Sequence, residues 1–155
     1  MSFPLPPAMR RALDLAAEAG RAGEVPVGAV VSRDGQFIAE AANAMRGGND
    51  PTAHAEMLAI RRAAEAIGSS RLDGCELWVT LEPCAMCAMA MVHARIARLV
   101  FAASDPKTGA AGSVFDLLGD PRHNHWVAVH GGVMAEEAGS RLSAYFRRKR
   151  GRSVD

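Results

Sequence analysis

Three features that would set the chain apart from ordinary globular proteins are missing from it. Only three of its 155 residues are cysteines, and two of these form a Cys-x-x-Cys pair, so a disulfide framework is excluded. The longest apolar run, from Cys84 to Val92, is far shorter than the roughly 20 residues that a membrane-spanning helix needs. The opening residues lack the basic segment and apolar core of a signal peptide, so we expect a cytoplasmic protein. No internal repeat or linker is present, and we expect residues 1–155 to form a single domain.

Strong net charge is also missing, but the basic residues are unevenly placed. The formal net charge is +1. Residues 141–155 nevertheless contain a single acidic residue, Asp155, and a cluster of basic ones: Arg141, Arg147, Arg148, Lys149, Arg150 and Arg152. A terminal block of this kind often contacts a polyanion, and a solvated helix end is an equally good interpretation of the charge alone.

The hydrophobic pattern predicts helices that alternate with strands. Helices are expected over residues 7–22, 50–67, 83–94, 113–118 and 134–150, and strands over 25–31, 37–39, 77–79, 98–103 and 126–129. Asp34-Gly35 predicts a hairpin between the first two strands, and Asp50 is expected to cap the second helix ahead of Pro51. This order predicts an α/β fold, a three-layer α/β/α arrangement with a five-stranded mixed sheet. Residues 150–155 are expected to be disordered.

A cysteine pair follows directly after a proline, in the segment Thr80-Leu81-Glu82-Pro83-Cys84-Ala85-Met86-Cys87. Proline is favoured at the first position of a helix, and residues three apart on a helix share one face. Both sulfurs can therefore point to one place. The positive end of the helix dipole favours thiolate over thiol, which is the form that binds metals.

Two cysteines do not complete a metal site, and His54 is the natural third ligand. Glu56 follows it by two residues, and H-x-E followed later by P-C-x-x-C is the signature of the zinc-dependent nucleobase deaminases. Three protein ligands leave a fourth zinc position for water, as in catalytic zinc sites. Glu56 is then expected to move protons during a hydrolytic deamination and not to bind the metal.

Plainer interpretations exist for each of these residues. A lone Cys-x-x-Cys could be a redox pair or half of a structural zinc site, but a complete redox or four-cysteine pattern is missing. Cys75 is expected to be a buried, small apolar residue. The other histidines stand in no such motif and are expected to be structural or exposed: His93, His123, His125 and His130.

From Met9 to Arg150 the sequence resembles the bacterial tRNA-specific adenosine deaminases. The segments that carry the resemblance are Glu24–Val30, Asp50–Glu56, Val79–Cys84, Asp105–Ser113 and Asn124-His125. The resemblance implies a cytidine deaminase-like fold, one Zn²⁺ per subunit and conversion of the wobble adenosine of an arginine tRNA to inosine. It also implies a homodimer in which the tRNA anticodon stem-loop touches both subunits.

The resemblance also implies roles for individual residues. Asn43 would contact the flipped nucleoside, Val27 and Leu81 would line the base pocket, and Ala55 would offer its backbone N–H. The residues implied to meet the anticodon loop are Asp105, Lys107, Phe146 and either Arg147 or Arg148. Tyr145-Phe146 would keep a stacking surface for unpaired bases.

Two segments depart from the family pattern, residues 44–49 and 61–74, and tRNA preference could differ if either touches RNA. Two rival functions remain open at this stage. A guanine or nucleoside deaminase would use the same chemistry on a small substrate and would not need the basic C-terminal residues. A non-catalytic, zinc-stabilised RNA-binding module would need a fourth protein ligand.

Overall fold

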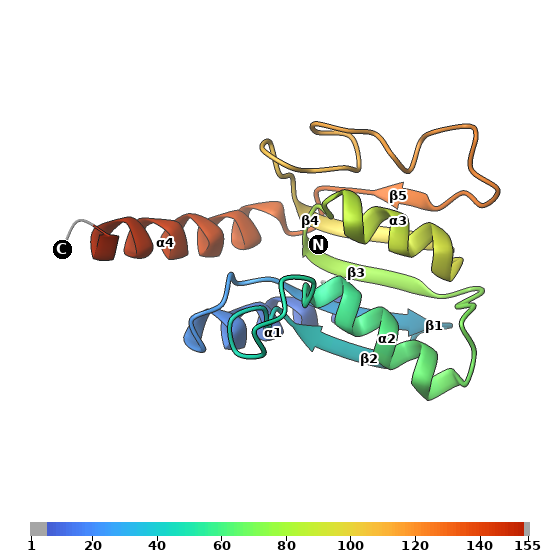
Figure 1. The fold of residues 1–155 in the computed structure, drawn as a ribbon, viewed down its shortest axis with the longest axis horizontal. Coiled ribbons are helices and arrows are strands. Elements are labelled where there is room, and N and C mark those ends of the chain that lie inside the picture. The colour runs from blue at the N-terminus through green and yellow to red at the C-terminus, as the bar shows by residue number, and fades with distance from the viewer. Residues whose placement is uncertain (1–5, 154–155) are drawn as a thin grey trace, which may run out of the picture.

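The middle layer of the protein is a mixed sheet whose strands lie in the order β2-β1-β3-β4-β5 (Figure 1). A computed structural model describes residues 6–153 of the chain. Its strands are β1 (Gly28–Arg33), β2 (Gln36–Ala42), β3 (Glu76–Leu81), β4 (Arg98–Ala103) and β5 (Ala128–His130). β1 pairs antiparallel with β2 and β3, whereas β3, β4 and β5 are parallel. The expected five-stranded mixed sheet is therefore confirmed.

Helices cover both faces of this sheet. They are α1 (Pro7–Arg21), α2 (Ala55–Ile67), α3 (Ala85–Ala94) and α4 (Ala135–Ser153). α2 and α3 lie on one face and α1 on the other, while α4 contacts α1 and its C-terminal part projects past the sheet (Figure 1). α1 approaches β1 so closely that a Cβ on Gly28 would collide with the backbone of Ala12. The three-layer α/β/α arrangement is thus built around one continuous apolar core.

The start of α2 corrects the sequence prediction, because the helix begins at Ala55 and not at Asp50-Pro51. Asp50 caps no helix. Its side chain accepts hydrogen bonds from the backbone N–H of Thr52 at 2.9 Å and from the Thr52 hydroxyl at 2.7 Å. This local turn holds residues 50–52 outside the helix, so that His54 becomes the residue immediately before its first turn.

A second correction concerns residues 113–118, where no helix forms. The backbone N–H groups of Val114 and Phe115 both donate to Gly109, and Ala111 forms an isolated antiparallel bridge with Asp116. These bonds replace the i to i−4 pattern that a helix requires. The segment is therefore a folded loop that lies against the end of β3.

Element boundaries differ in smaller ways. β1 and β5 each begin later than predicted, which leaves Pro26 and Trp126 outside the sheet. α4 continues to Ser153, past residue 150, where disorder is expected to begin. The disorder of the last residues stays a prediction, and residues 154–155 lie outside the described part of the chain. Within residues 6–153, no helix combines the length and apolar character needed to cross a membrane.

Candidate active site

The three residues predicted to bind a metal meet where two helices begin. His54 immediately precedes α2 and Cys84 immediately precedes α3, both in extended backbone conformation, and Cys87 lies in the first turn of α3. Nδ1 of His54 is 3.4 Å from Sγ of Cys87 and 3.6 Å from Sγ of Cys84. The two helix starts therefore direct an imidazole and two sulfurs to one point.

The separations within this cluster fit a tetrahedral zinc ion. Nitrogen and sulfur ligands at ordinary zinc distances lie about 3.6 Å apart when the geometry is tetrahedral. A hydrogen bond from Cys87 lowers the pKa of the Cys84 thiol to about 4, and His54 adds to this effect. The same bond, together with burial, raises the pKa of Cys87. The two sulfurs thus differ in acidity, and a bound cation is what would stabilise both as thiolates.

Glu56 lies in the first turn of α2, close to this cluster but outside the group of converging ligands. Its residue surface is only 4% exposed, and burial raises the pKa of its carboxyl group. Within residues 6–153, the ligand atoms that converge within 4.8 Å of one another belong to His54, Cys84 and Cys87. A buried carboxyl group with a raised pKa beside a potential metal position suits proton transfer at neutral pH.

Asn43 links the end of β2 to the start of α2. Its backbone N–H donates to the carbonyl of Val27 at 3.0 Å, and its side-chain Oδ1 accepts from the backbone N–H of Ala55 at 2.9 Å. Asn43 and Ala55, both implied by the resemblance to contact the nucleoside, therefore bind each other. A nucleoside that uses the Ala55 N–H has to take it from Asn43.

Known proteins share this arrangement over most of the chain. Residues 6–135 match the family model of the MafB19-like deaminases. A tRNA-specific adenosine deaminase from Haemophilus influenzae is 50% identical over 143 residues, which are 92% of this chain and 83% of that relative. The chain belongs to the tRNA-specific adenosine deaminases.

Solved structures of two kinds resemble this deaminase. A structure from work on A-to-I editing by tRNA:A34 deaminases aligns with a TM-score of 0.84 and 47% identity, over 87% of this chain and 98% of that one. A guanine deaminase from Bacillus subtilis aligns with a TM-score of 0.64 and 34% identity, over 94% and 95% of the two chains. The fold is common to both, and the sequence is closer to the tRNA enzyme.

A hollow of about 830 Å³ gathers several of the residues implied to contact RNA in this deaminase. Leu81 at the end of β3, Asp105 and Lys107 in the loop after β4, and Phe146 and Arg147 on α4 all line it. Phe146 is 42% exposed. The hollow therefore combines an aromatic ring with cationic side chains, and one of its lining residues, Leu81, lies three residues before Cys84 in the sequence.

Two of the implied RNA contacts lie elsewhere. Arg148 lines a different groove, between α4 and α1, so of the two alternatives Arg147 is the one placed in the hollow. Tyr145 packs edge-to-face against Phe146, with ring centroids 5.3 Å apart, but is only 7% exposed. The exposed stacking surface is therefore Phe146 alone.

Sequence reasoning missed the role of Glu82, which is buried directly after β3. Its carboxylate accepts hydrogen bonds from the backbone N–H groups of Asp105 at 3.0 Å, Ala111 at 2.9 Å and Ser113 at 3.1 Å, and from the Ser113 hydroxyl. Burial alone would raise the pKa of Glu82, but these bonds outweigh it and hold the pKa below its usual value. A Cβ on Gly109 would collide with the same carboxylate. Glu82 thus holds the loop that lines the hollow.

Glu24 plays a similar part for the other loop beside the site. It is 5% exposed and accepts hydrogen bonds from the backbone N–H groups of Arg46 at 3.0 Å and Gly47 at 2.9 Å. Glu24 and Glu82 both lie in segments that carry the family resemblance. That position is the one indication in the sequence that these two residues matter. Nothing in either segment indicates which distant N–H groups the carboxylates would bind.

The remaining candidates behave as expected. Cys75 is fully buried in the core. His123 and His125 each bind a backbone carbonyl, those of Leu117 and Ile96, and His93 and His130 are exposed. None of these four histidines belongs to the metal-ligating cluster found within the described residues.

Proposed function

We propose that this protein hydrolyses the wobble adenosine of a tRNA anticodon to inosine, with arginine tRNA as the substrate. The observation that carries this proposal is the buried carboxylate Glu56 beside a cluster of three ligands. Such a set leaves one metal position for water and provides a base to activate it. The hollow lined by Lys107 and Phe146 supports a single-stranded RNA substrate over a free base.

The chain's own residues would divide the chemistry between them. Zinc held by His54, Cys84 and Cys87 would supply a water whose pKa falls towards ~7. Glu56 would take a proton from this water, pass it to a ring nitrogen of the base, and then protonate the leaving amine. Water adds at C6 of adenine and ammonia leaves, so the product is inosine.

The adenosine has to leave its stack before it can reach this centre. Val27 and Leu81 would line the pocket for the extruded base, and Asn43 would contact its nucleoside. The neighbouring nucleotides of the anticodon loop would lie in the hollow, against Phe146 and Arg147. Unpaired RNA bases stack on aromatic rings while cations contact their phosphates, and this hollow offers both groups.

We also propose that the protein acts as a homodimer with α3 at or near the interface. Met89 and Val92 of α3 line one hollow together with residues 122–124. Large apolar side chains are also exposed in the chain between β4 and β5: Val114 at 46%, Phe115 at 52% and Trp126 at 62%. Exposed apolar patches of this kind mark interaction sites, and sedimentation that finds a monomer at micromolar concentration would contradict the proposal.

A tRNA substrate favours a cytoplasmic location. Residues 1–155 would act as a single deaminase domain, because the candidate site draws on both helix layers and on the sheet. Neither residues 44–49 nor residues 61–74, which depart from the family pattern, line the hollow described above.

The test is to incubate the purified protein with total tRNA and to map inosine by sequencing. We expect inosine at the first anticodon position of arginine tRNA and one zinc ion per chain by elemental analysis. Guanine, cytidine and an anticodon stem-loop serve as parallel substrates. Turnover of guanine or cytidine without turnover of any RNA would replace the proposal with a small-molecule deaminase. Zinc binding without turnover of any substrate would favour the RNA-binding module.

A further inference from the structure

α4 carries two basic faces that point to different parts of the molecule. Positions 143, 146, 147 and 150 recur at helical spacing and line the hollow beside the loop after β4. Positions 141, 144 and 148 recur in the same way and line a groove of about 510 Å³ between α4 and α1. The two faces are the opposite sides of one helix, about 10–12 Å across with its side chains.

Three arginines line the groove between α4 and α1, and its other lining residues are small or apolar. Arg21 from the end of α1 lies in it together with Arg141 and Arg148. It continues at Gly20 and Arg148 into a smaller hollow that Arg46, Tyr145 and Lys149 also line. Among the lining residues that the structure describes, none is an aspartate or a glutamate.

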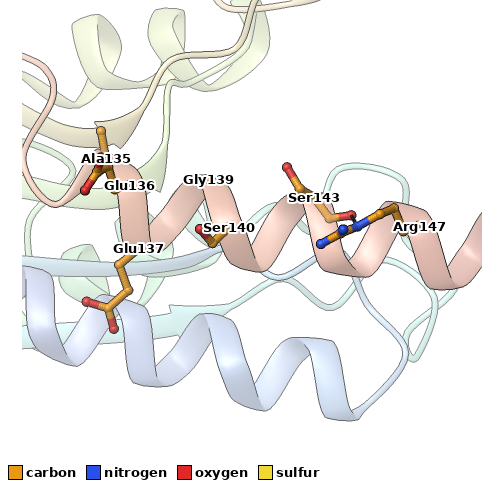
Figure 2. Close-up of a pocket in the computed structure, with 7 residues that line it drawn as sticks. All are labelled: Ala135, Glu136, Glu137, Gly139, Ser140, Ser143 and Arg147. Carbon is orange, nitrogen blue, oxygen red and sulfur yellow. Dashed lines mark hydrogen bonds between the residues drawn. The ribbon is translucent and has the colours of Figure 1, made fainter.

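Glu137 lies on α4 four residues before Arg141, and its carboxylate is already paired. Figure 2 shows Glu137 pointing from α4 towards α1. It accepts from Arg10 at 2.9 Å and from Arg141 at 3.3 Å, so Arg141 is partly neutralised. Arg21, Arg148 and Lys149 are exposed and form no ion pair with any residue that the structure describes. Their charge is therefore available to an anion from outside the chain.

The two faces differ in the group that would accompany these cations. The face towards the hollow presents the exposed ring of Phe146, whereas the face towards α1 presents Tyr145, whose ring is 7% exposed. Lys149 covers that ring at 5.8 Å from its centroid. The groove therefore offers cations without an exposed aromatic platform, which suits phosphates and not unpaired bases.

We propose that this groove binds the phosphate backbone of the base-paired tRNA stem while the hollow binds the anticodon loop. Double-stranded RNA is recognised mainly through its shape, its phosphates and its 2′-hydroxyl groups, which need no stacking surface. This proposal rests on the proposed tRNA function and extends it from the loop to the stem. It assigns Arg21, Arg46, Arg148 and Lys149 to RNA positions beyond the anticodon loop.

The test compares the double variant Arg21→Ser/Lys149→Ser with the wild type on two RNAs, full-length tRNA and a minimal anticodon hairpin with a short stem. We expect the variant to bind full-length tRNA more weakly. The slope of log affinity against log salt should fall by about 0.9 for each lost phosphate contact, the value known for duplex DNA. Binding and deamination of the minimal hairpin should not change.

The matched control is Arg33→Ser/Arg71→Ser, which removes two exposed arginines from the opposite end of the sheet. It should change neither the binding nor the deamination of either RNA. Equal weakening on both RNAs would overturn the proposal, because the groove would then contact the loop. Unchanged binding and slope on full-length tRNA would overturn it too, because the groove would only be solvated. Failure of the wild type to deaminate the minimal hairpin would count against the proposed function, and the two results are read separately.

Discussion

The candidate catalytic centre and the hollow proposed to bind RNA are built in opposite ways. The centre is made of short motifs at the starts of two helices, and Glu56, the group proposed to transfer protons, is almost fully buried. The hollow is open and brings together side chains from β3, from a loop and from α4. The proposed chemistry and the proposed RNA recognition therefore differ in their structural support. Substitutions should distinguish the two regions as well. Those in the centre should change kcat, and those in the hollow should change the affinity for RNA.

The largest effect should come from removing a ligand. Cys87→Ala leaves His54 and Cys84, and two ligands cannot hold zinc in a shaped site. We expect both the metal and all deamination to be lost. Zinc content by mass spectrometry and inosine formation should be measured on one preparation. Retention of one zinc per chain would show that the ligand set is wrong.

Glu56→Gln should abolish chemistry and leave the metal in place. Glutamine keeps the size of the side chain but cannot accept and return protons. We expect kcat to fall by at least ~10²–10⁴, the usual contribution of general acid–base catalysis. Zinc content and tRNA affinity should match the wild type. Loss of zinc would make Glu56 a ligand, and near-normal turnover would assign the proton transfer to another group.

Glu82→Gln should sharpen the comparison, because Glu82 follows the strand that leads to the cysteines yet holds the loop proposed to contact RNA. Hydrogen bonds to a charged acceptor contribute about 1.5–3 kcal/mol each, and an amide cannot accept all of these N–H groups. We expect KM for tRNA to rise by about tenfold or more, the equivalent of ~1.4 kcal/mol, with kcat and zinc nearly unchanged.

Glu76→Gln is the matched control for that experiment. Glu76 lies on the same strand and pairs with Arg98 at the far end, away from the loop. It should leave KM unchanged. A fall in kcat at constant KM in Glu82→Gln would place Glu82 with the catalytic centre and break the division described above.

Arg147→Ala should have the smallest effect. Arg147 faces the hollow, and each contact to a single-stranded phosphate contributes about 0.7 to the slope of log affinity against log salt. We expect the slope for a minimal anticodon hairpin to fall by about that amount, with kcat unchanged. An unchanged slope would mean that this side chain is only solvated.

The sequence was most informative where the chemistry depends on local spacing. His54, Glu56, Cys84 and Cys87 lie in two short motifs, and the structure brings these motifs together. The sequence was less informative where a distant group decides the conformation. Residues 113–118 have a helix-like pattern, but Glu82 and Gly109 bind their N–H groups, and neither partner can be read from that segment. Arg147 lines the hollow, whereas Arg148 lines the groove against α1. This difference depends on where α1 packs, which the sequence around these two residues does not show.

The way Glu82 holds its loop has a consequence for how such an enzyme can acquire a new substrate. Glu82 accepts hydrogen bonds from the main-chain N–H groups of Asp105, Ala111 and Ser113. Every residue except proline provides such a group. The exposed side chain of Lys107 takes no part in this anchoring. Selection or directed evolution can therefore vary position 107 against a loop of constant shape, and altered specificity need not be accompanied by lost stability.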